Sequence, residues 1–331
     1  MKISCVMTAY NEGKLLRQAV ASILNQTHED LELIIVDDGG SAETKAELAA
    51  LSDPRIRIIE QSNDGLSSAR NRGLRHCTGE YVCFLDADDT RAPWAFAEAA
   101  RAIEISGAEL LLVRGVMARP HGPLEFFMDE VSAEGAEDEV AQTGKLDIAA
   151  KRAWAASFEP QSANKFIARA LIDRGKLSFP NGHFFEDIMF HTMAVAHAQS
   201  IEFLNARSFT YFHRQLRPQL TGSNQTIRYD IIGVATVTFQ IFAAHPTFAN
   251  ERMRGAVSIG VLRLLRWCEM TISLDRRASY RAVLRQALRS VDPRFFVISE
   301  SAPDPRDERE MLQDFVREHL QLQGATDEPA A

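Results

Sequence analysis

The alternation of short apolar runs with segments of helical periodicity restricts the fold of this chain more than any other feature of its sequence. Two early runs, KISCVMTAY at residues 2–10 and LELIIVDDG at residues 31–39, are continuously apolar, as strands buried on both faces are. Residues 12–27 lie between them and repeat apolar side chains at helical spacing. Further strand-like runs follow at residues 55–61, 79–89 and 108–118. The pattern predicts an α/β fold with a doubly wound, mostly parallel sheet.

Aspartates stand at the ends of two of these predicted strands. Asp37 and Asp38 end the second run, and Asp86, Asp88 and Asp89 end the run GEYVCFLDADD. Ligands of doubly wound sheets bind where the carboxyl ends of the strands meet, so we expect these side chains to share one edge. Asp86 and Asp88 are two residues apart, which on a strand places both on one side, and two like charges there favour a bound cation. Such oxygen ligands suit Mg²⁺ or Mn²⁺, which also binds phosphate oxygens.

A structural interpretation of the same acids is a helix cap. In that interpretation Asp89 or Thr90 caps the predicted helix PWAFAEAARAIEIS at residues 93–106. A cap needs one acid, whereas this segment has three. Capping alone therefore does not explain the cluster.

Further along the chain the patterns are weaker. Residues 125–145 are acidic and predict a surface loop or a short frayed helix. Residues 162–175 predict a helix, and residues 201–214 predict a strand. Amphipathic helical patterns fill the chain after residue 226.

Several motifs follow one another in a fixed order. They are AYNEG at residues 9–13, VDDG at 36–39, SNDGLSSARNRGL at 62–74, LDADD at 85–89 and GHFFEDIMF at 182–190. In this order they resemble the family 2 glycosyltransferases, which have the GT-A fold. The resemblance is close over residues 1 to about 115 and looser up to YFHRQLRP at residues 211–218. Two positions depart from the family wording, because Thr8 replaces the usual Pro and Gly40 the usual Ser.

The resemblance implies a pocket for the nucleotide of a sugar donor. It places Tyr10 against the base, lets Asp38 accept a hydrogen bond from a base N–H, and gives Asp86 the ribose hydroxyls. Arg70 and its neighbour Asn71 are expected to face the nucleotide. The full predicted donor set is Thr8, Ala9, Tyr10, Asn11, Glu12, Asp38, Asn63, Arg70, Asp86 and Ala87. For Tyr10 the alternative is an aromatic side chain that packs on the core.

Metal binding and base catalysis are assigned in the same way. By resemblance Asp88 binds the Mn²⁺ or Mg²⁺ that bridges the two phosphates, and His213 is a further candidate ligand whose alternative role is structural. Asp187 is the expected base for the acceptor hydroxyl, with Glu186 as its rival or as a residue that holds the acceptor. Apolar neighbours in FFEDIMF favour a raised carboxylate pKa. The alternative is that these two acids only cap the helix that follows.

The activity that the resemblance implies is inverting transfer of a sugar from a nucleoside diphosphate donor, with a UDP-sugar favoured, to a hydroxyl of a glycan or lipid-linked acceptor. Polysaccharide biosynthesis at the cell surface is the expected setting. A base and a bridging cation suffice for a single displacement, without a protein nucleophile. The alternatives are a nucleotidyltransferase and a non-catalytic relative that binds nucleotide sugars.

Two regions are predicted, a catalytic domain at residues 1–225 and a helical region at residues 226–331 that packs, places the acceptor or mediates self-association. A net charge of −8 argues against nucleic-acid binding. The chain lacks a recognisable secretion signal and spanning segment, so we expect a cytoplasmic protein that can contact the inner face of the membrane.

Overall fold

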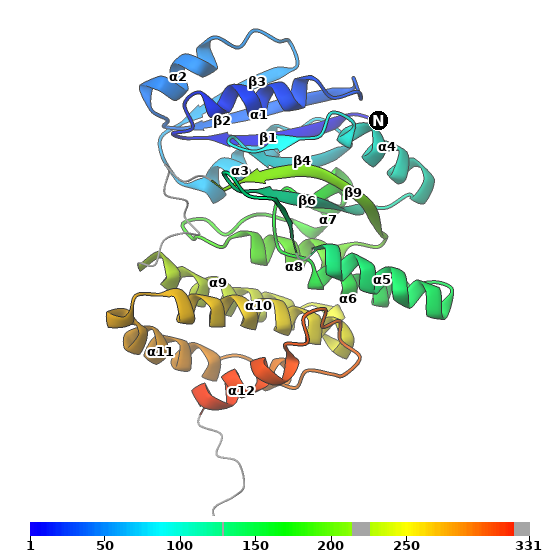
Figure 1. Ribbon diagram of the computed structural model, residues 1–331, viewed down its shortest axis with the longest axis vertical. Helices are drawn as coiled ribbons and strands as arrows, with labels where there is room; N and C mark the ends of the chain where they lie inside the picture. Colours follow the sequence, from blue (N-terminus) through cyan, green and yellow to red (C-terminus); the bar gives the residue numbers. More distant parts are fainter. Residues whose placement is uncertain (128, 214–225, 321–331) are drawn as a thin grey trace, which may run out of the picture.

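The computed structural model describes residues 1–127, 129–213 and 226–320 (Figure 1). Within these residues the chain builds one sheet of nine strands in the order β3-β2-β1-β4-β8-β6-β9-β5, with β7 paired to β6. The strands are β1 Ile3–Ala9, β2 Leu31–Asp38, β3 Ile56–Gln61, β4 Tyr81–Asp86, β5 Thr90–Arg91, β6 Leu110–Ala118, β7 Leu124–Phe126, β8 Lys165–Ala168 and β9 Ile201–Phe212.

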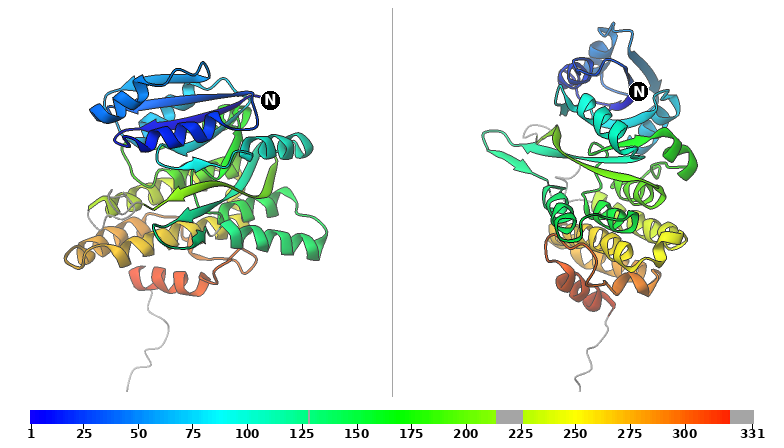
Figure 2. Two further views of the ribbon diagram at one scale, coloured as in Figure 1. Left: turned by 45° about the horizontal axis from the view of Figure 1, so that its top comes forward. Right: turned by 90° about the vertical axis from the view of Figure 1, so that its right-hand side faces the viewer.

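The sheet is parallel on one side and mixed on the other. Strands β3, β2, β1 and β4 are parallel, as the alternating pattern predicted. Strand β8 then enters antiparallel between β4 and β6, while β6 and β9 are parallel to each other. Strands β5 and β7 add short antiparallel pairs at β9 and β6. Figure 2 shows the β6–β7 hairpin extending away from the sheet.

Helices cover both faces of the sheet, which explains why its central strands are continuously apolar. On one face, Cys5 and Met7 of β1 pack with α1 and α4; on the other, Val6 packs with α3. Successive side chains of a strand point to opposite faces, so each face receives alternate residues. The helices of this part are α1 Leu15–Leu24, α2 Ala42–Ala49, α3 Leu66–His76 and α4 Ala95–Ser106.

Eight further α-helices follow in the part of the chain that the structure describes. They are α5 Asp129–Thr143, α6 Ile148–Ser157, α7 Arg169–Gly175, α8 Asp187–His197, α9 Asp230–Ala243, α10 Glu251–Thr271, α11 Leu274–Arg289 and α12 Arg309–Leu320. Helices α9–α12 lie beyond α5, α6 and α8 when seen from the sheet (Figures 1 and 2). One hydrophobic cluster runs from Val6 and Phe84 in the sheet to Leu284 and Val316 in the last helices. The helical region thus shares its core with the sheet, and its status as a separate domain stays a prediction.

Two sequence predictions were wrong. Residues 165–168, predicted as helix, form β8, because this short run is buried on both sides between β4 and β6. The acidic stretch predicted as a loop or frayed helix contains the 15-residue helix α5. Its small residues Ala133 and Ala136 are buried, which gives an otherwise polar helix a face to pack. Within the described ranges no helix is both long and apolar enough to cross a membrane.

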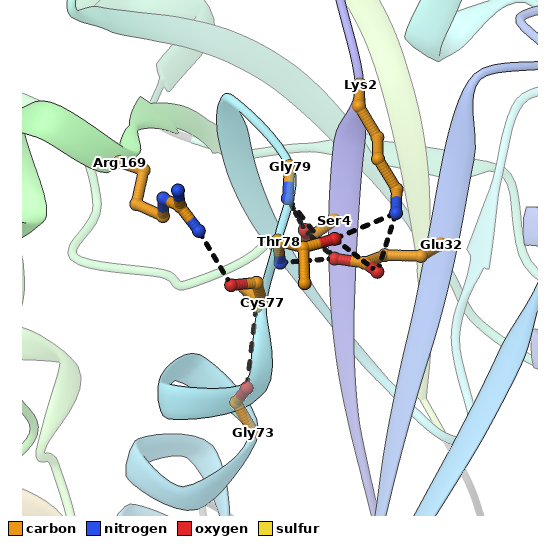
Figure 3. A network of polar contacts seen from close by, with 8 residues as sticks. All are labelled: Lys2, Ser4, Glu32, Gly73, Cys77, Thr78, Gly79 and Arg169. Carbon is orange, nitrogen blue, oxygen red and sulfur yellow. Dashed lines mark hydrogen bonds and ion pairs between the residues drawn. The ribbon is translucent and has the colours of Figure 1, made fainter.

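A polar network secures the amino-terminal end of the sheet. Glu32 of β2 accepts hydrogen bonds from the Ser4 hydroxyl at 2.5 Å, the Lys2 ammonium at 2.9 Å and the Thr78 N–H at 2.5 Å (Figure 3). The Gly79 N–H donates to Ser4 Oγ at 2.9 Å. These bonds lower the pKa of Glu32 to about 2, although its partial burial opposes them. The network therefore joins β1, β2 and the turn before β4 at the end opposite the predicted donor residues.

Candidate active site

The carboxyl ends of β1, β2 and β4 form the edge that carries most of the predicted donor residues. The parallel register pairs Thr8 with Asp86 and Ala9 with Asp37. Ala87 follows β4 directly and is buried. The structure thus brings Thr8, Ala9, Asp86 and Ala87 together, while their roles toward a nucleotide stay predictions.

The turn after β2 requires glycine at position 40. The Asp37 side chain accepts a hydrogen bond from the Gly40 N–H at 2.7 Å, so it braces this turn. A Cβ atom on Gly40 would lie 2.4 Å from the Tyr10 carbonyl oxygen and 2.9 Å from Asp37 Oδ1. Ser41, the next residue, caps α2 by accepting from the Thr44 N–H. Gly40 stands where the family usually has Ser. Because it has no side chain, the turn after β2 can approach the Tyr10 loop after β1 closely.

Asp38 has most of its hydrogen-bonding capacity engaged inside the protein. The side chain is 5% exposed, and it accepts from Gln61 Nε2 at 2.8 Å and from the N–H groups of Asp64 at 2.8 Å and Gly65 at 3.0 Å. These bonds tie the end of β2 to the loop before α3. A base N–H would have to share these oxygens.

The first loop is more accessible. The Tyr10 ring is 41% exposed, so it does not pack into the core as the alternative interpretation required. Its N–H donates to Glu12 Oε2 at 2.6 Å, and Asn11 Oδ1 accepts from the Ser41 N–H at 3.0 Å. Asn63 is exposed in the loop that follows β3. This loop geometry presents an aromatic face beside the strand ends, where a planar base can stack.

Arg70 is the centre of the site. It projects from α3, is 3% exposed, and its Nη1 donates to Glu186 Oε1 at 2.6 Å and to Asp187 Oδ1 at 2.9 Å. Its Nη2 donates to Asp86 Oδ1 at 2.9 Å. The planar guanidinium thereby joins the end of β4 to two acids that lie about a hundred residues later in the sequence.

This arrangement changes the roles predicted for α3. Arg70 was expected to face the nucleotide, but its donors are directed at three carboxylates. Asn71 was expected there too, yet its Nδ2 donates to the Phe179 carbonyl at 2.8 Å and its Oδ1 accepts from the Phe179 N–H at 2.8 Å. Asn71 therefore holds the chain that leads to the carboxylate pair.

Three carboxylates and one guanidinium leave the cluster short of positive charge. Burial raises the pKa of Glu186 to about 7, Asp187 adds repulsion, and Arg70 opposes both. Burial also raises the pKa of Asp187, against the attraction of Arg70 and Lys165. For Arg70 burial acts to lower the pKa, but the surrounding acids raise it overall. One of the two helix-end carboxyls is thus poised to hold a proton near neutral pH.

Exposure separates the two candidate bases. The Glu186 side chain is 5% exposed and Asp187 26%, while Asp86 is 42% exposed. Asp187 can therefore meet an incoming hydroxyl more readily than Glu186. Glu186 precedes α8 but makes no side-chain capping bond, so the capping alternative finds no support in that residue. Phe185, just before the pair, has a φ of 66°, a strained conformation of the kind that collects at functional sites.

The predicted metal ligands come from two chain segments that meet. Antiparallel pairing of β5 with β9 sets Thr90 opposite Thr210, and the Phe212 N–H donates to Asp89 Oδ1 at 2.9 Å. His213 follows β9 directly, so this register brings it toward the turn that carries Asp88. A carboxylate and an imidazole are suitable ligands for Mn²⁺. Two protein ligands are enough for a cation whose coordination shell is completed by water and phosphate oxygens. Among the described residues no group of three or more potential ligands comes together.

Three details of the aspartate segment differ from the predictions. β4 ends at Asp86, so Asp88 lies in a turn and not on the strand with Asp86. Neither Asp89 nor Thr90 caps α4, because Thr90 belongs to β5 and α4 begins at Ala95 without a side-chain cap. Arg214 and Arg217, considered as diphosphate contacts, lie outside the described residues.

Sequence reasoning missed a buried polar group behind Asp187. Lys165 attracts the negative charge of the Asp187 carboxylate and so opposes the rise of its pKa on burial. Lys165 is fully buried, and its Nζ donates to the Gln161 carbonyl and, at 2.6 Å, to Asn164 Oδ1. The only sequence signal is a lysine within an apolar run, SANKFIA, in the stretch that was predicted as a helix.

The chain is similar in sequence to known glycosyltransferases. Residues 4–131 match the family model described as Glycosyl transferase family 2. The putative glycosyltransferase EpsH of Bacillus subtilis is 31% identical over 219 residues, which cover 63% of this chain and 60% of EpsH. An uncharacterized glycosyltransferase of Nostoc sp., alr2836, is 42% identical over 96 residues, 28% of this chain and 30% of that protein. The chain thus spans less than two thirds of either relative.

Solved structures share the whole architecture. S. aureus TarS residues 1–349, in complex with UDP-GlcNAc, superimposes with a TM-score of 0.71 at 16% identity, covering 96% of this chain and 88% of that one. The mannosyltransferase PcManGT of Pyrobaculum calidifontis, in complex with GDP-Man and Mn²⁺, gives a TM-score of 0.52 at 17% identity over 97% of this chain and 88% of that one. The predicted GT-A fold with a helical C-terminal region is confirmed. Residues 4–131 thus match glycosyl transferase family 2 in sequence, in line with the motif order and strand-end geometry described above.

Proposed function

We propose that this protein transfers a sugar from a nucleoside diphosphate donor to a hydroxyl group of a glycan or lipid-linked acceptor, with inversion at the anomeric carbon. The observation that carries the proposal is the Arg70 cluster, because it joins the donor-side strand end at Asp86 to the carboxylate pair Glu186 and Asp187. Donor contacts and a base are the two halves that a single displacement needs. The family match and the UDP-GlcNAc complex of TarS support a UDP-sugar as the donor.

Asp187 is the proposed base. It is more exposed than Glu186, and burial raises its pKa, which makes the carboxylate a stronger base toward the acceptor hydroxyl. Arg70 holds the carboxylate by donating to its Oδ1 at 2.9 Å. Glu186 is more buried than Asp187, and both carboxylates accept from Arg70. This position suits a residue that holds the acceptor or adjusts the charge of the carboxylate pair.

Asp88, with His213 as a second candidate, is proposed to hold Mn²⁺ or Mg²⁺ beside the donor. When bound, such a cation offsets the negative charge of the diphosphate, both in the bound donor and in the leaving group. Without it, the acidic strand ends would repel the donor, by about 4 kcal/mol for each close pair of unit charges. The Mn²⁺ in the PcManGT complex supports the choice of metal.

A thermal-shift titration tests donor and metal together. Purified protein is titrated with UDP-GlcNAc and, separately, with GDP-mannose, each with and without Mn²⁺. We expect UDP-GlcNAc to raise the melting temperature only with Mn²⁺, and we expect Asp88→Ala to remove that dependence. Asp187→Asn should keep the shift and lose UDP release. Asp173→Asn, in α7 away from the strand ends, is the matched control and should change neither.

The same measurements separate the alternatives. A nucleotidyltransferase would be stabilised by a nucleoside triphosphate and would release diphosphate, which contradicts the proposal. A non-catalytic binder would show the Mn²⁺-dependent shift but no transfer and no UDP release with any donor. A shift in neither condition, for either donor, would remove the proposed donor class.

A further inference from the structure

An exposed apolar surface lies where α10 ends and α11 begins. Three apolar side chains and two partly exposed arginines form it, and we call this set the α10–α11 corner: Trp267, Met270, Leu274, Arg266 and Arg277. Leu274 is 78% exposed, Met270 56% and Trp267 37%. Arg266 and Met270 are four residues apart on α10 and so share a face, and Arg277 Nη2 donates to the Met270 carbonyl at 2.8 Å. The apolar side chains and the cations therefore lie on one surface.

The charge of this part of the chain is opposite to that of the whole. Residues 251–290, which contain α10 and α11, have nine arginines and three acids, a net charge of +6, whereas the whole chain carries −8. Some of these charges are paired, since Arg281 contacts Glu269 at 2.6 Å and Arg276 lies 3.9 Å from the exposed Asp275. The two arginines of the corner make no ion pair with the residues that the structure describes. The α10–α11 corner thus keeps two positive charges on an acidic protein.

The corner adjoins the loop that carries the carboxylate pair. The Trp267 ring meets the Phe185 ring edge to face, with centroids 6.5 Å apart and planes at 78°, and Phe185 directly precedes Glu186. The guanidinium carbon of the buried Arg228 lies 3.8 Å from the Trp267 ring centroid, so the indole is held in place. Figure 1 shows the turn between α10 and α11 on the same side of the molecule as the carboxyl end of β1. A partner that covered the corner would therefore lie next to the proposed acceptor side of the site.

We propose that the α10–α11 corner binds the surface of a lipid bilayer that carries anionic headgroups. Its apolar side chains enter the boundary between headgroups and acyl chains, where Trp is favoured, and its two arginines meet the phosphates. A soluble polyanion would meet the arginines but leave Leu274 and Met270 in water. A second copy of this chain, in a symmetric interface, would place the arginines of one corner against those of the other. An anionic bilayer satisfies both the charge and the apolar surface.

Vesicle flotation of the full chain tests the proposal without donor or activity. Two kinds of vesicle are compared, neutral phosphatidylcholine and phosphatidylcholine with about 30% phosphatidylglycerol, each at about 50 mM and about 500 mM NaCl. We expect the protein to float with the anionic vesicles at low salt, and its partition coefficient to fall about tenfold for neutral vesicles and for high salt. No binding to the anionic vesicles, or equal binding to both kinds, overturns the proposal.

Two double variants separate the apolar and the charged parts of the corner. Met270→Ser with Leu274→Ser should lower the partition coefficient about tenfold at low salt, because two apolar side chains no longer leave water. Arg266→Gln with Arg277→Gln should lower it about fivefold for each arginine at low salt, the equivalent of about 1 kcal/mol each, and by less at high salt. Binding that is unchanged in either double variant overturns the assignment to this corner.

A matched control lies on α4, which packs on the sheet. Arg101 and Ile105 are both exposed there and have the same four-residue spacing as Arg266 and Met270. Arg101→Gln with Ile105→Ser should therefore leave vesicle binding unchanged, and a loss equal to that of the corner variants would overturn the proposal. If the variant with two serines does not fold, Leu274→Ser replaces it and should lower the partition coefficient about threefold; no change there also overturns the proposal.

The other partners give different results. A dimer in light scattering that Met270→Ser with Leu274→Ser dissociates, without vesicle binding, would assign the corner to a second copy and overturn the proposal. Retention on heparin without vesicle binding would overturn it as well. The outcome is independent of the donor experiment, because vesicle binding without a UDP-GlcNAc shift retains the corner and rejects the donor class. A Mn²⁺-dependent shift without vesicle binding does the reverse.

Discussion

Replacement of Glu186 by Gln should make the protein more stable at neutral pH, although it removes a charge that contacts Arg70. Burial raises the pKa of Glu186 from its ordinary 4.5 to about 7, even though Arg70 donates to it at 2.6 Å. The single guanidinium also serves Asp86 and Asp187, so it does not compensate the buried charge of Glu186 in full. Gln has nearly the same shape and keeps an oxygen for Arg70, but it carries no charge to bury.

The magnitude follows from proton linkage. Each pH unit between the unfolded and folded pKa corresponds to about 1.4 kcal/mol, so the interval from 4.5 to about 7 gives about 3 kcal/mol. The folded-state pKa is the higher one, so the stability contribution is present in full below pH 4.5. It is lost as the pH rises through about 7, because the unfolded chain can ionise Glu186 more easily than the folded protein can.

The assay is urea unfolding of wild type and Glu186→Gln between pH 4 and 8. We expect equal free energies of unfolding near pH 4 and a gain of up to about 3 kcal/mol for the variant at pH 8. Glu32→Gln is the control of opposite sign: bonds to Ser4, Thr78 and Lys2 lower the pKa of Glu32 to about 2, so its contribution is present above pH 4.5 and lost as the pH falls. That variant should be less stable at pH 8, by about 1–2 kcal/mol after allowance for solvent screening.

The result would refute the reasoning if Glu186→Gln were less stable than wild type at pH 8, or if the difference between them did not change with pH. Either outcome would mean that Arg70 compensates the Glu186 charge completely. The cluster would then be a satisfied ion network with a structural role, and the raised pKa would lose its place in the proposed mechanism.

Two other substitutions probe the same edge of the sheet. Arg70→Met should lower the free energy of unfolding at pH 7.5 by about 3–5 kcal/mol, because it leaves buried carboxylates without their shared cation. The loss should be smaller at pH 4.5, where the carboxylates are protonated. A loss of stability that does not depend on pH in urea unfolding would contradict this prediction. Gly40→Ala should cost about 1–3 kcal/mol and weaken the UDP-GlcNAc thermal shift, because the added Cβ would meet the Tyr10 carbonyl at 2.4 Å. Gly122→Ala, where the nearest atom would be 3.4 Å away, is its control and should leave both unchanged.

The parts of the fold that the sequence predicts well are those whose signal is local. Parallel strands β1, β2 and β4 are continuously apolar, and the clear helical periodicity of residues 12–27 marks the crossover from β1 to β2, so their order and their shared carboxyl edge could be predicted. Strand β8 could not, because its four residues resemble part of a helix and only the positions of β4 and β6 determine their conformation. A pairing of segments far apart in the chain leaves no local pattern.

The same distinction holds for the site. Asp88 could be predicted as a candidate from its place after a strand end. Asp86 at the strand end, and Glu186 and Asp187 in a motif of the expected order, could be predicted as candidates in the same way. Their contacts with Arg70 could not, since the sequence does not say which of several arginines near a glycine-rich turn points inward. Lys165 was missed for the related reason that a lysine is usually exposed, and its burial depends on Asn164 and on the Gln161 carbonyl.

The side chains of the site carry more negative than positive charge. Asp86, Glu186 and Asp187 carry three negative charges when ionised, whereas Arg70, which contacts all three, carries one positive charge, so the balance of this cluster is −2. Burial makes such an imbalance costly, and the protein alone relieves it by holding protons on its buried acids, as the raised pKa of Glu186 indicates. One divalent cation supplies the same two charges. Under the proposed function, binding of Mn²⁺ with the donor would therefore favour the ionised form of the carboxylate pair, so that the base becomes competent when the donor is in place.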